Sequence, residues 1–348
     1  MLGKSNVCVA VLKNLGDFSA YEKNIRYHQS PGKSQILIQR DEEARADSTF
    51  ERVRQARSRR SNNADGLFAA ISQEDAMTEK IKRTERRVAL TKILTSRPSQ
   101  LFSLSYFSTL FEAAKSTLSE DMEAIGQSLE QFGLGKLETV AGASGGVRYL
   151  PCRSMDSMGS LLTELSEKMS TSDRIITGGF LYMSDILYDA HRMARVGEIF
   201  MTLFAHTSPD VVMTVETKGI PLAMMTARAF NIPLVIVRRG SKVTEGPAVS
   251  INYVTGSSKR IQTMSLPKRA LASGAKALII DDFMKAGGTA RGMIDLAREV
   301  GAEVVGTGVL VATSEPEHKL VDDYVTLLIL SEVDEQTKKV VITPKMPI

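Results

Sequence analysis

The chain has 348 residues, of which 43% are hydrophobic and 24% charged, and its only cysteines are Cys8 and Cys152. This length predicts two domains, and the cysteine count excludes a disulfide framework. The sequence shows neither a signal peptide nor an apolar run of about 18 residues, which predicts a cytoplasmic protein. The net charge of +4 comes from residues 1–76 and 77–150, so affinity for phosphates is expected there or in local patches.

Residues 1–76 show no pattern of a hydrophobic core. They contain polar runs and a cluster of basic residues at Arg52, Arg54, Arg57, Arg59 and Arg60. Such a cluster either grips nucleic acid or forms a solvated, disordered face, and the composition favours the second interpretation. We therefore predict that residues 1–76 are an extension, disordered or not part of the native core, with Met77 as a candidate native start.

Three helices are predicted after this extension. The first, ERRVALTKILTSRP, places Val88, Ile93 and Leu94 on one face and stops at Pro98. The second, LSYFSTLF, is capped by a serine at position 103 or 105. The third starts near residue 114 and ends at Gly133. Its apolar residues recur at steps of three and four, which predicts a core face of Leu118, Met122, Ile125 and Leu129.

A β-hairpin follows, because LETVAGASGGVRYLP forms two strand-like runs around a glycine-containing turn. Three helices and a hairpin within residues 77–150 are the order of a winged helix-turn-helix domain. Its third helix would read DNA, flanked by arginines of the first helix and the wing; the predicted contacts are Lys115, Ser116, Thr117, Ser119, Arg83, Arg86, Arg87 and Arg148. The same pattern also fits a helical cap or a dimerisation module with an ordinary charged surface.

Strands alternate with helices from residue 154 onward. DVVMTV, IPLVIVRR and ALIID are strand-like, whereas DAHRMARVGEIFMTLFAHT, KGIPLAMMTARAF and GGTARGMIDLAREV are helix-like. This alternation predicts an α/β domain over residues 151–348 with an open, mostly parallel sheet. Such sheets bind ligands beyond the carboxyl ends of their strands, where DVVMTV and ALIID both open into polar loops.

The stretch ALIIDDFMKAGGT joins a buried strand to two carboxylates and a glycine-rich loop. Asp281 and Asp282 can accept hydrogen bonds from ribose hydroxyls, and the loop KAGGT, at a helix N-terminus, can hold a phosphate. In the second loop, VETKGIP, Lys218 and Gly219 can hold a pyrophosphate. Together these groups fit 5-phosphoribosyl-1-pyrophosphate (PRPP). An Asp-Asp pair alone is more often a magnesium site or a solvated turn.

This pattern resembles the PRPP-binding motif of type I phosphoribosyltransferases, although Lys285 and Ala286 depart from the usual ATGGT loop. Together with the winged helix, TKGIPLA, VRRGSKVTEG and SINYVTGSSKRIQTMS, it resembles the purine operon repressor (PurR) family of Gram-positive bacteria over most of residues 83–330. The resemblance implies a dimeric transcription repressor of purine synthesis and transport genes. In that family a phosphoribosyltransferase fold acts as a sensor, and PRPP is the inducer that weakens DNA binding.

The resemblance also implies a set of ligand residues. The ribose phosphate would contact Asp281, Asp282, Lys285, Ala286, Gly287, Gly288 and Thr289, and the pyrophosphate would contact Thr217, Lys218 and Gly219. A mobile loop and nearby basic residues would add Arg238, Lys242, Tyr253, Lys259 and Arg260, unless these only solubilise an exposed hairpin. Mg²⁺ is a plausible companion of PRPP, since pyrophosphate oxygens are hard ligands.

Two functions from different classes are compatible with these residues. One is a PRPP-responsive repressor, and the other is an active purine phosphoribosyltransferase with an appended regulatory or assembly domain. An enzyme needs a hood that recognises a purine base, and GGFLYMSDIL at 178–187 occupies the expected place without a residue set that dictates a base. Because a winged helix is attached, we predict the repressor, with the phosphoribosyltransferase fold as a sensor rather than an enzyme.

Overall fold

The structure is a computed structural model that describes residues 81–346 except 143, 241–243, 245 and 255–259. The predicted extension 1–76 and the candidate start Met77 lie outside the described residues. No helix in the described part of the chain is long and apolar enough to cross a membrane.

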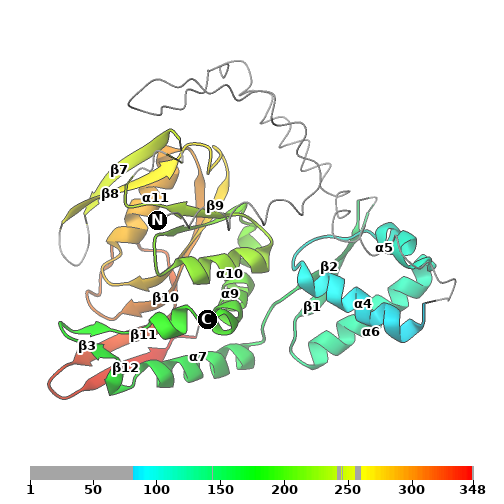
Figure 1. Cartoon of the computed structure of the whole chain (residues 1–348), viewed down its shortest axis with the longest axis horizontal. Coiled ribbons are helices and arrows are strands. Elements are labelled where there is room, and N and C mark those ends of the chain that lie inside the picture. Colours follow the sequence, from blue (N-terminus) through cyan, green and yellow to red (C-terminus); the bar gives the residue numbers. More distant parts are fainter. Residues whose placement is uncertain (1–80, 143, 241–243, 245, 255–259, 347–348) are drawn as a thin grey trace, which may run out of the picture. The chain divides into compact units, whose positions relative to one another are not determined.

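The first group of elements is a winged helix-turn-helix domain, as predicted (Figure 1). Its elements are α4 (Arg83–Ser96), α5 (Leu104–Phe111), α6 (Lys115–Gln131), β1 (Lys136–Val140) and β2 (Gly146–Leu150). The Ser103 hydroxyl caps α5 by accepting a hydrogen bond from the backbone N–H of Tyr106. Gly133 follows α6 with a φ of 65°, the left-handed conformation that ends many helices. The strands β1 and β2 pair antiparallel to form the wing.

The predicted core face of α6 is confirmed, but that of α4 is partly wrong. Leu118, Met122, Ile125 and Leu129 are all buried. On α4 the buried side chains are Arg86, Leu90, Ile93 and Leu94. Leu90 follows Arg86 by four residues, and Ile93 and Leu94 follow Leu90 by three and four, so these side chains share one face of the helix. Val88 falls on the other side, where it is 66% exposed.

The second group of elements surrounds a six-stranded sheet of order β12-β11-β10-β9-β5-β6. Neighbouring strands are parallel except for the antiparallel edge strand β12, which confirms the predicted mostly parallel sheet. The strands are β5 (Val211–Val215), β6 (Leu234–Val237), β9 (Lys276–Met284), β10 (Glu303–Thr313), β11 (Val325–Asp334) and β12 (Lys339–Pro344).

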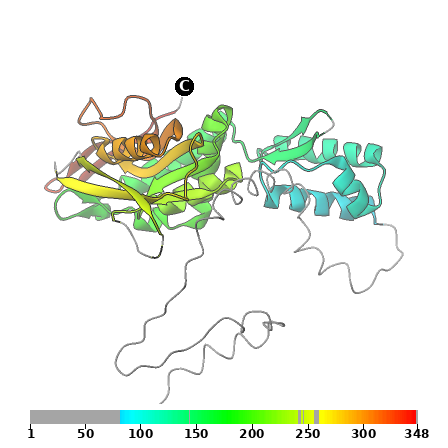
Figure 2. The ribbon, with the colours of Figure 1, turned by 90° about the horizontal axis from the view of Figure 1, so that it is seen from above.

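Two apolar layers cover this sheet. One contains α7 (Met155–Met169), α9 (Ala190–Phe204) and α10 (Ile220–Phe230). The other contains α11 (Gly288–Glu299) and the antiparallel hairpin of β7 (Ala248–Val254) and β8 (Ile261–Pro267), which lie beside each other (Figure 2). Successive strand residues alternate between the layers, so that Val212 belongs to the first cluster and Met213 to the second.

Short elements complete the domain. The hairpin of β3 (Ile175–Ile176) and β4 (Phe180–Leu181) leads into α8 (Ser184–Leu187), and 3₁₀ turns occur at Ser172–Arg174 and Ala205–Thr207. Within the sheet, β5 and β9 are neighbours, with β6 on one side and β10 on the other. The strand order therefore reverses between β5 and β9, and a ligand site is expected beyond the carboxyl ends of these two strands.

Candidate functional site

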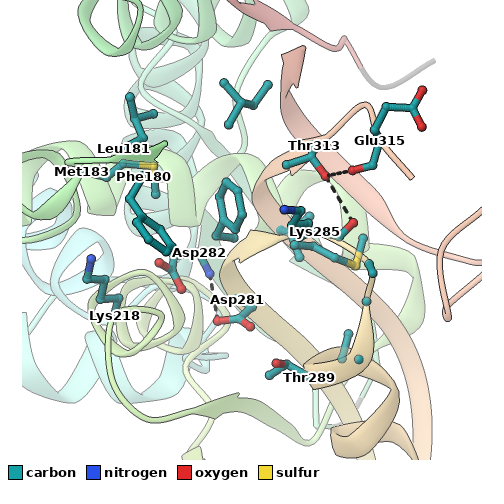
Figure 3. Close-up of a pocket in the computed structure, with 18 of the residues that line it drawn as sticks. Phe180, Leu181, Met183, Lys218, Asp281, Asp282, Lys285, Thr289, Thr313 and Glu315 are labelled. Carbon is teal, nitrogen blue, oxygen red and sulfur yellow. Dashed lines mark hydrogen bonds between the residues drawn. The ribbon is translucent and has the colours of Figure 1, made fainter. Parts of the chain in front are cut away.

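A cavity of about 930 Å³ opens at this reversal point (Figure 3). Its walls come from the β3–β4 hairpin, Lys218, Arg239, the β7–β8 hairpin and the residue runs 281–290, 313–315 and 330–333. The loops after β5, β9 and β10 thus converge on one space, as the sequence predicts for the two loops that follow DVVMTV and ALIID.

Asp281 and Asp282 are adjacent on β9, which continues past the predicted strand to Met284. Asp281 is 5% exposed, and its Oδ1 accepts a 3.0 Å hydrogen bond from the backbone N–H of Asp282. In Figure 3, Asp281 turns toward Thr289 and Asp282 toward Lys218. Both carboxylates therefore reach the cavity, from which donors such as ribose hydroxyls can approach them.

The two carboxylates have raised pKa values. Burial raises the pKa of Asp281 well above its ordinary value of 3.8, and the charge of Asp282 raises it further. Burial also raises the pKa of Asp282, although the hydrogen bond with Asp281 and the charge of Lys218 act in the opposite direction. A site that binds donors or positive charge would relieve this electrostatic cost.

The loop that follows β9 brings its five predicted residues to the cavity wall. Lys285, Ala286, Gly287, Gly288 and Thr289 all line the cavity. Gly287 has a φ of 80°, which favours glycine, and α11 begins at the next residue. The first N–H groups of a helix have no partners within the helix, so this loop presents donors to an anion.

The 313–320 segment makes hydrogen bonds with this loop. The backbone N–H of Leu320 donates to the Ala286 carbonyl at 2.9 Å. The Thr313 hydroxyl donates to the Glu315 carbonyl at 2.5 Å and lies 3.3 Å from the Lys285 carbonyl. Lys319 in turn donates to the Thr313 carbonyl at 2.8 Å. These contacts connect the loop to the 313–320 segment.

The loop between β5 and α10 contributes one lining side chain, Lys218, whereas Thr217 and Gly219 are not part of the cavity wall. Gly219 instead packs against the carboxylate pair. A Cβ added there would lie 2.5 Å from Asp281 Oδ1 and 2.8 Å from Thr214 Oγ1. Within the described chain, the Thr214 hydroxyl is buried without a hydrogen-bond partner. Gly219 is therefore required by close packing, a role that the sequence pattern did not reveal.

The basic residue that lines the cavity after β6 is Arg239, not the predicted Arg238. Arg238 continues the strand: its backbone exchanges hydrogen bonds of 2.9 and 2.8 Å with Ser265, and its guanidinium pairs with Glu216 at 3.4 Å. Arg239 also lowers the pKa of Asp281, against the larger effects of burial and Asp282. Arg238 is held by Ser265 and Glu216, and the next residue, Arg239, lies at the cavity.

Tyr253 lines the cavity, and its contact with a ligand stays a prediction. It is 8% exposed, packs against Gly292 of α11, and donates a 2.8 Å hydrogen bond to Gln262 across the β7–β8 hairpin. Arg260 is exposed and is not a lining residue. Lys242 and Lys259 lie outside the described residues, so their predicted roles are not addressed by the structure.

The predicted hood forms part of the cavity wall. Gly178, Gly179, Phe180, Leu181 and Met183 line the cavity. The segment is held by Arg174, which is 7% exposed and makes a bidentate pair with Asp185 at 2.8 and 2.9 Å. Arg174 also donates to the carbonyls of Lys168 and Tyr182. Its position in a polar run gave no sequence signal of this structural role.

The predicted DNA-reading residues lie at the N-terminus of α6. Lys115, Ser116 and Ser119 are exposed and Thr117 is half-buried. The Ser119 hydroxyl donates to the Lys115 carbonyl at 3.0 Å. On the wing, Arg148 pairs with Glu138 across β1 and β2. Polar side chains are thus available on the first turns of α6, as a groove-reading helix requires.

The three arginines of α4 converge on one carboxylate, which the sequence pattern did not predict. Arg83, Arg86 and Arg87 all donate to Asp121 of α6. The Arg86 side chain is only 9% exposed, so its predicted contact with DNA is wrong and it stabilises the helix pair instead. Arg83 and Arg87 are partly exposed, at 55% and 35%.

Comparisons with known proteins agree with this architecture. The family model of the bacterial purine repressor N-terminal domain matches residues 82–151, and that of the phosphoribosyl transferase domain matches residues 183–344. A transferase, the xanthine phosphoribosyltransferase of Geobacillus thermodenitrificans, is 34% identical over 154 residues, covering 43% of this chain and 79% of that protein.

Two relatives match this chain over most of their own length. The purine biosynthesis transcriptional repressor PurR of Bacillus subtilis is 48% identical over 261 residues, covering 75% of this chain and 92% of that protein. The purine biosynthesis transcriptional activator PurR of Lactococcus lactis subsp. lactis is 39% identical over 254 residues, covering 73% of this chain and 94% of that protein. With a winged helix, a phosphoribosyltransferase domain and this similarity, the chain belongs to the PurR family of purine biosynthesis transcriptional regulators.

Proposed function

We propose that this protein is a PRPP-responsive repressor of purine synthesis and transport genes, acting on DNA in the cytoplasm. It would bind operator DNA as a homodimer, so that two winged helices read two half-sites, and PRPP would release it. The observation that carries this proposal is the cavity of about 930 Å³, which the Asp281–Asp282 pair, Lys218 and the loop 285–289 line together in a chain that also carries a purine repressor N-terminal domain.

PRPP would be bound by complementary charge at both of its ends. Its ribose hydroxyls would donate to Asp281 and Asp282, which need donors because burial raises both pKa values. Its 5-phosphate would occupy the loop 285–289 at the start of α11, and its pyrophosphate would lie near Lys218 and Arg239. Thr217 and Gly219 would shape this second loop through their backbone.

Mg²⁺ would enter with the ligand. Among the described residues, no group of three or more histidine, cysteine, aspartate or glutamate side chains could hold a metal ion. The donor set therefore fits an ion held mainly by pyrophosphate oxygens, with the Asp281–Asp282 pair as the nearest protein carboxylates. The ion would neutralise part of the ligand's charge.

Repression rather than activation is proposed because the relative named a repressor is 48% identical to this chain over the aligned residues and the relative named an activator is 39% identical. The release would be a linkage effect. If DNA and PRPP favour different forms of the protein, with a coupling free energy of about 1–3 kcal/mol, each ligand lowers the affinity of the protein for the other by the same factor.

The DNA-reading role of α6 can be tested by replacing Lys115 and Thr117 with alanine. We expect the double variant to bind a purine-gene control region at least about tenfold more weakly, with a smaller salt slope, because one phosphate-binding charge is lost. PRPP affinity should not change. The measurement is fluorescence anisotropy over a salt series, and Lys92→Ala, an exposed lysine of α4, is the matched control. Unchanged DNA binding by the double variant would exclude α6 as the reading helix.

An active purine phosphoribosyltransferase is the second candidate function. It is favoured by the 34% identity to a xanthine phosphoribosyltransferase and by a hood that lines the cavity. The two functions are separated by incubating the protein with PRPP, Mg²⁺ and each purine base and measuring pyrophosphate release. The repressor proposal expects no turnover above the rate without protein.

A further inference from the structure

One carboxylate joins the first turn of α4 to the α6 helix. The Asp121 side chain is fully buried, and its oxygens accept hydrogen bonds from Arg83 Nε at 3.1 Å, Arg86 Nε at 2.7 Å and Arg87 Nε at 2.8 Å. Glu120 adds an exposed pair with Arg83 at 3.2 Å. All three basic side chains that α4 offers near its N-terminus are therefore turned toward the protein.

This carboxylate remains ionised. Burial alone would raise the pKa of Asp121, but hydrogen bonds from Arg87, Arg86 and Arg83 outweigh that effect and hold the pKa below 3.8. At neutral pH Asp121 and Glu120 together offset two of the three arginine charges. The cluster thus carries one net positive charge instead of three.

The cluster lies close to the proposed reading surface. Asp121 follows Lys115 by six residues on α6, which corresponds to about 9 Å along the helix axis. This distance is within about one Debye length at physiological ionic strength, so DNA phosphates at the N-terminus of α6 would attract the arginines. The bonds to Asp121 and Glu120 oppose that attraction.

We propose that Asp121 is a positioning residue for DNA discrimination. It fixes the first turns of α6 against α4, and it withholds Arg83 and Arg87 from the phosphate backbone. Phosphate contacts carry no sequence information, so withholding them keeps sequence-independent binding weak, while a fixed α6 keeps the contacts that read bases in place. This inference rests on the proposed DNA-binding function.

The test uses Asp121→Asn in the full chain, which removes the charge and keeps the shape. Affinity for a purine-gene control region and for an unrelated duplex is measured over a salt series. We expect tighter binding to the unrelated duplex, a slope of log K against log salt steeper by about 0.9 for each arginine released, and at least a tenfold smaller ratio of specific to unrelated binding. A merely structural role would weaken operator binding without steepening the slope for unrelated DNA, and that result would overturn the inference.

The matched control is Glu130→Gln, which makes the same change of charge at an exposed position of α6. It should leave the ratio of specific to unrelated binding within about twofold of the original. If the asparagine variant fails to fold because Arg86 is left without its buried partner, the double variant Arg83→Gln/Arg87→Gln decides the question.

Both side chains in that double variant are partly exposed, so a folded protein is expected. The inference predicts that its slope on unrelated DNA stays within about 0.5 of the original, because these arginines do not contact phosphates in the original protein. If the slope of log K against log salt is lower by about 1.8, the two arginines do contact phosphates in the original protein, and the inference is overturned. If the original protein does not prefer the control region, the proposed function itself fails, and this result is distinct from either variant outcome.

Discussion

Replacement of Asp281 and Asp282 by asparagine is expected to weaken PRPP binding by at least about 100-fold. Each ribose hydroxyl would lose a charged acceptor, and hydrogen bonds to charged groups contribute about 1.5–3 kcal/mol each. Two such losses correspond to a factor of about 100 or more. Isothermal titration calorimetry with PRPP measures the loss, and binding to a purine-gene control region without PRPP should be unchanged.

The same double variant is expected to be more stable than the original at neutral pH. The folded protein holds both carboxyl pKa values above the ordinary 3.8, so their charged forms oppose folding when the pH exceeds the raised values. As the pH falls from neutral toward 3.8, these groups bind protons in the folded state first, and the original protein gains stability relative to the variant. Thermal unfolding at several pH values should therefore show a higher unfolding temperature for the variant at neutral pH, and the difference from the original protein should shrink as the pH decreases.

Asp295→Asn is the matched control for both measurements. Asp295 lies on α11, pairs with Arg291 at 3.0 Å, and is not a lining residue of the cavity. Its replacement should leave PRPP affinity within about twofold and should not increase stability at neutral pH. PRPP binding that survives in the double variant would contradict the assignment of the ribose site to Asp281 and Asp282.

Replacement of Gly219 by alanine is expected to weaken PRPP binding by at least about tenfold. The backbone of Gly219 has a φ of −69°, which alanine adopts without strain. The new methyl group, however, would lie 2.5 Å from Asp281 Oδ1 and 2.8 Å from Thr214 Oγ1, so the carboxylate or the Lys218 loop must move. Calorimetry with PRPP should show the loss even where thermal unfolding shows a folded protein.

Gly159→Ala provides the control for this substitution. Gly159 lies in α7, and a Cβ there would meet only Met346 at 3.8 Å, an ordinary van der Waals distance. This variant should bind PRPP normally and unfold at the same or a higher temperature. Normal PRPP binding by Gly219→Ala would mean that the loop can shift without cost, and that close packing does not explain the glycine.

The sequence was sufficient for the architecture because its signals there are periodic or local. The core face of α6 follows a helical repeat, the cap at Ser103 is a one-residue signal, and the loop 285–289 combines a strand, carboxylates and glycines. These patterns depend on residues that are near one another in the chain, and they predicted both the fold and the cavity edge.

The errors concern residues whose roles depend on distant partners. Arg238 and Arg239 are chemically alike, and they differ in that Arg238 pairs with the distant residue Ser265 whereas Arg239 lines the cavity. Arg86 reads as a surface cation until Asp121, on another helix, is brought beside it. Arg174 likewise gains its role only from Asp185 and from two carbonyls of the folded hood. Tertiary contacts decide these cases.

The most direct test of the antagonism between PRPP and DNA is one titration of the full chain against a fluorescent purine-gene control region at fixed salt, with and without PRPP and Mg²⁺. The account predicts tight binding that PRPP weakens by about 5–150-fold, the range expected for a coupling free energy of 1–3 kcal/mol. The Asp281→Asn/Asp282→Asn variant should bind the same DNA and show no response. Equal DNA affinity with and without PRPP in the original protein would contradict the proposed switch.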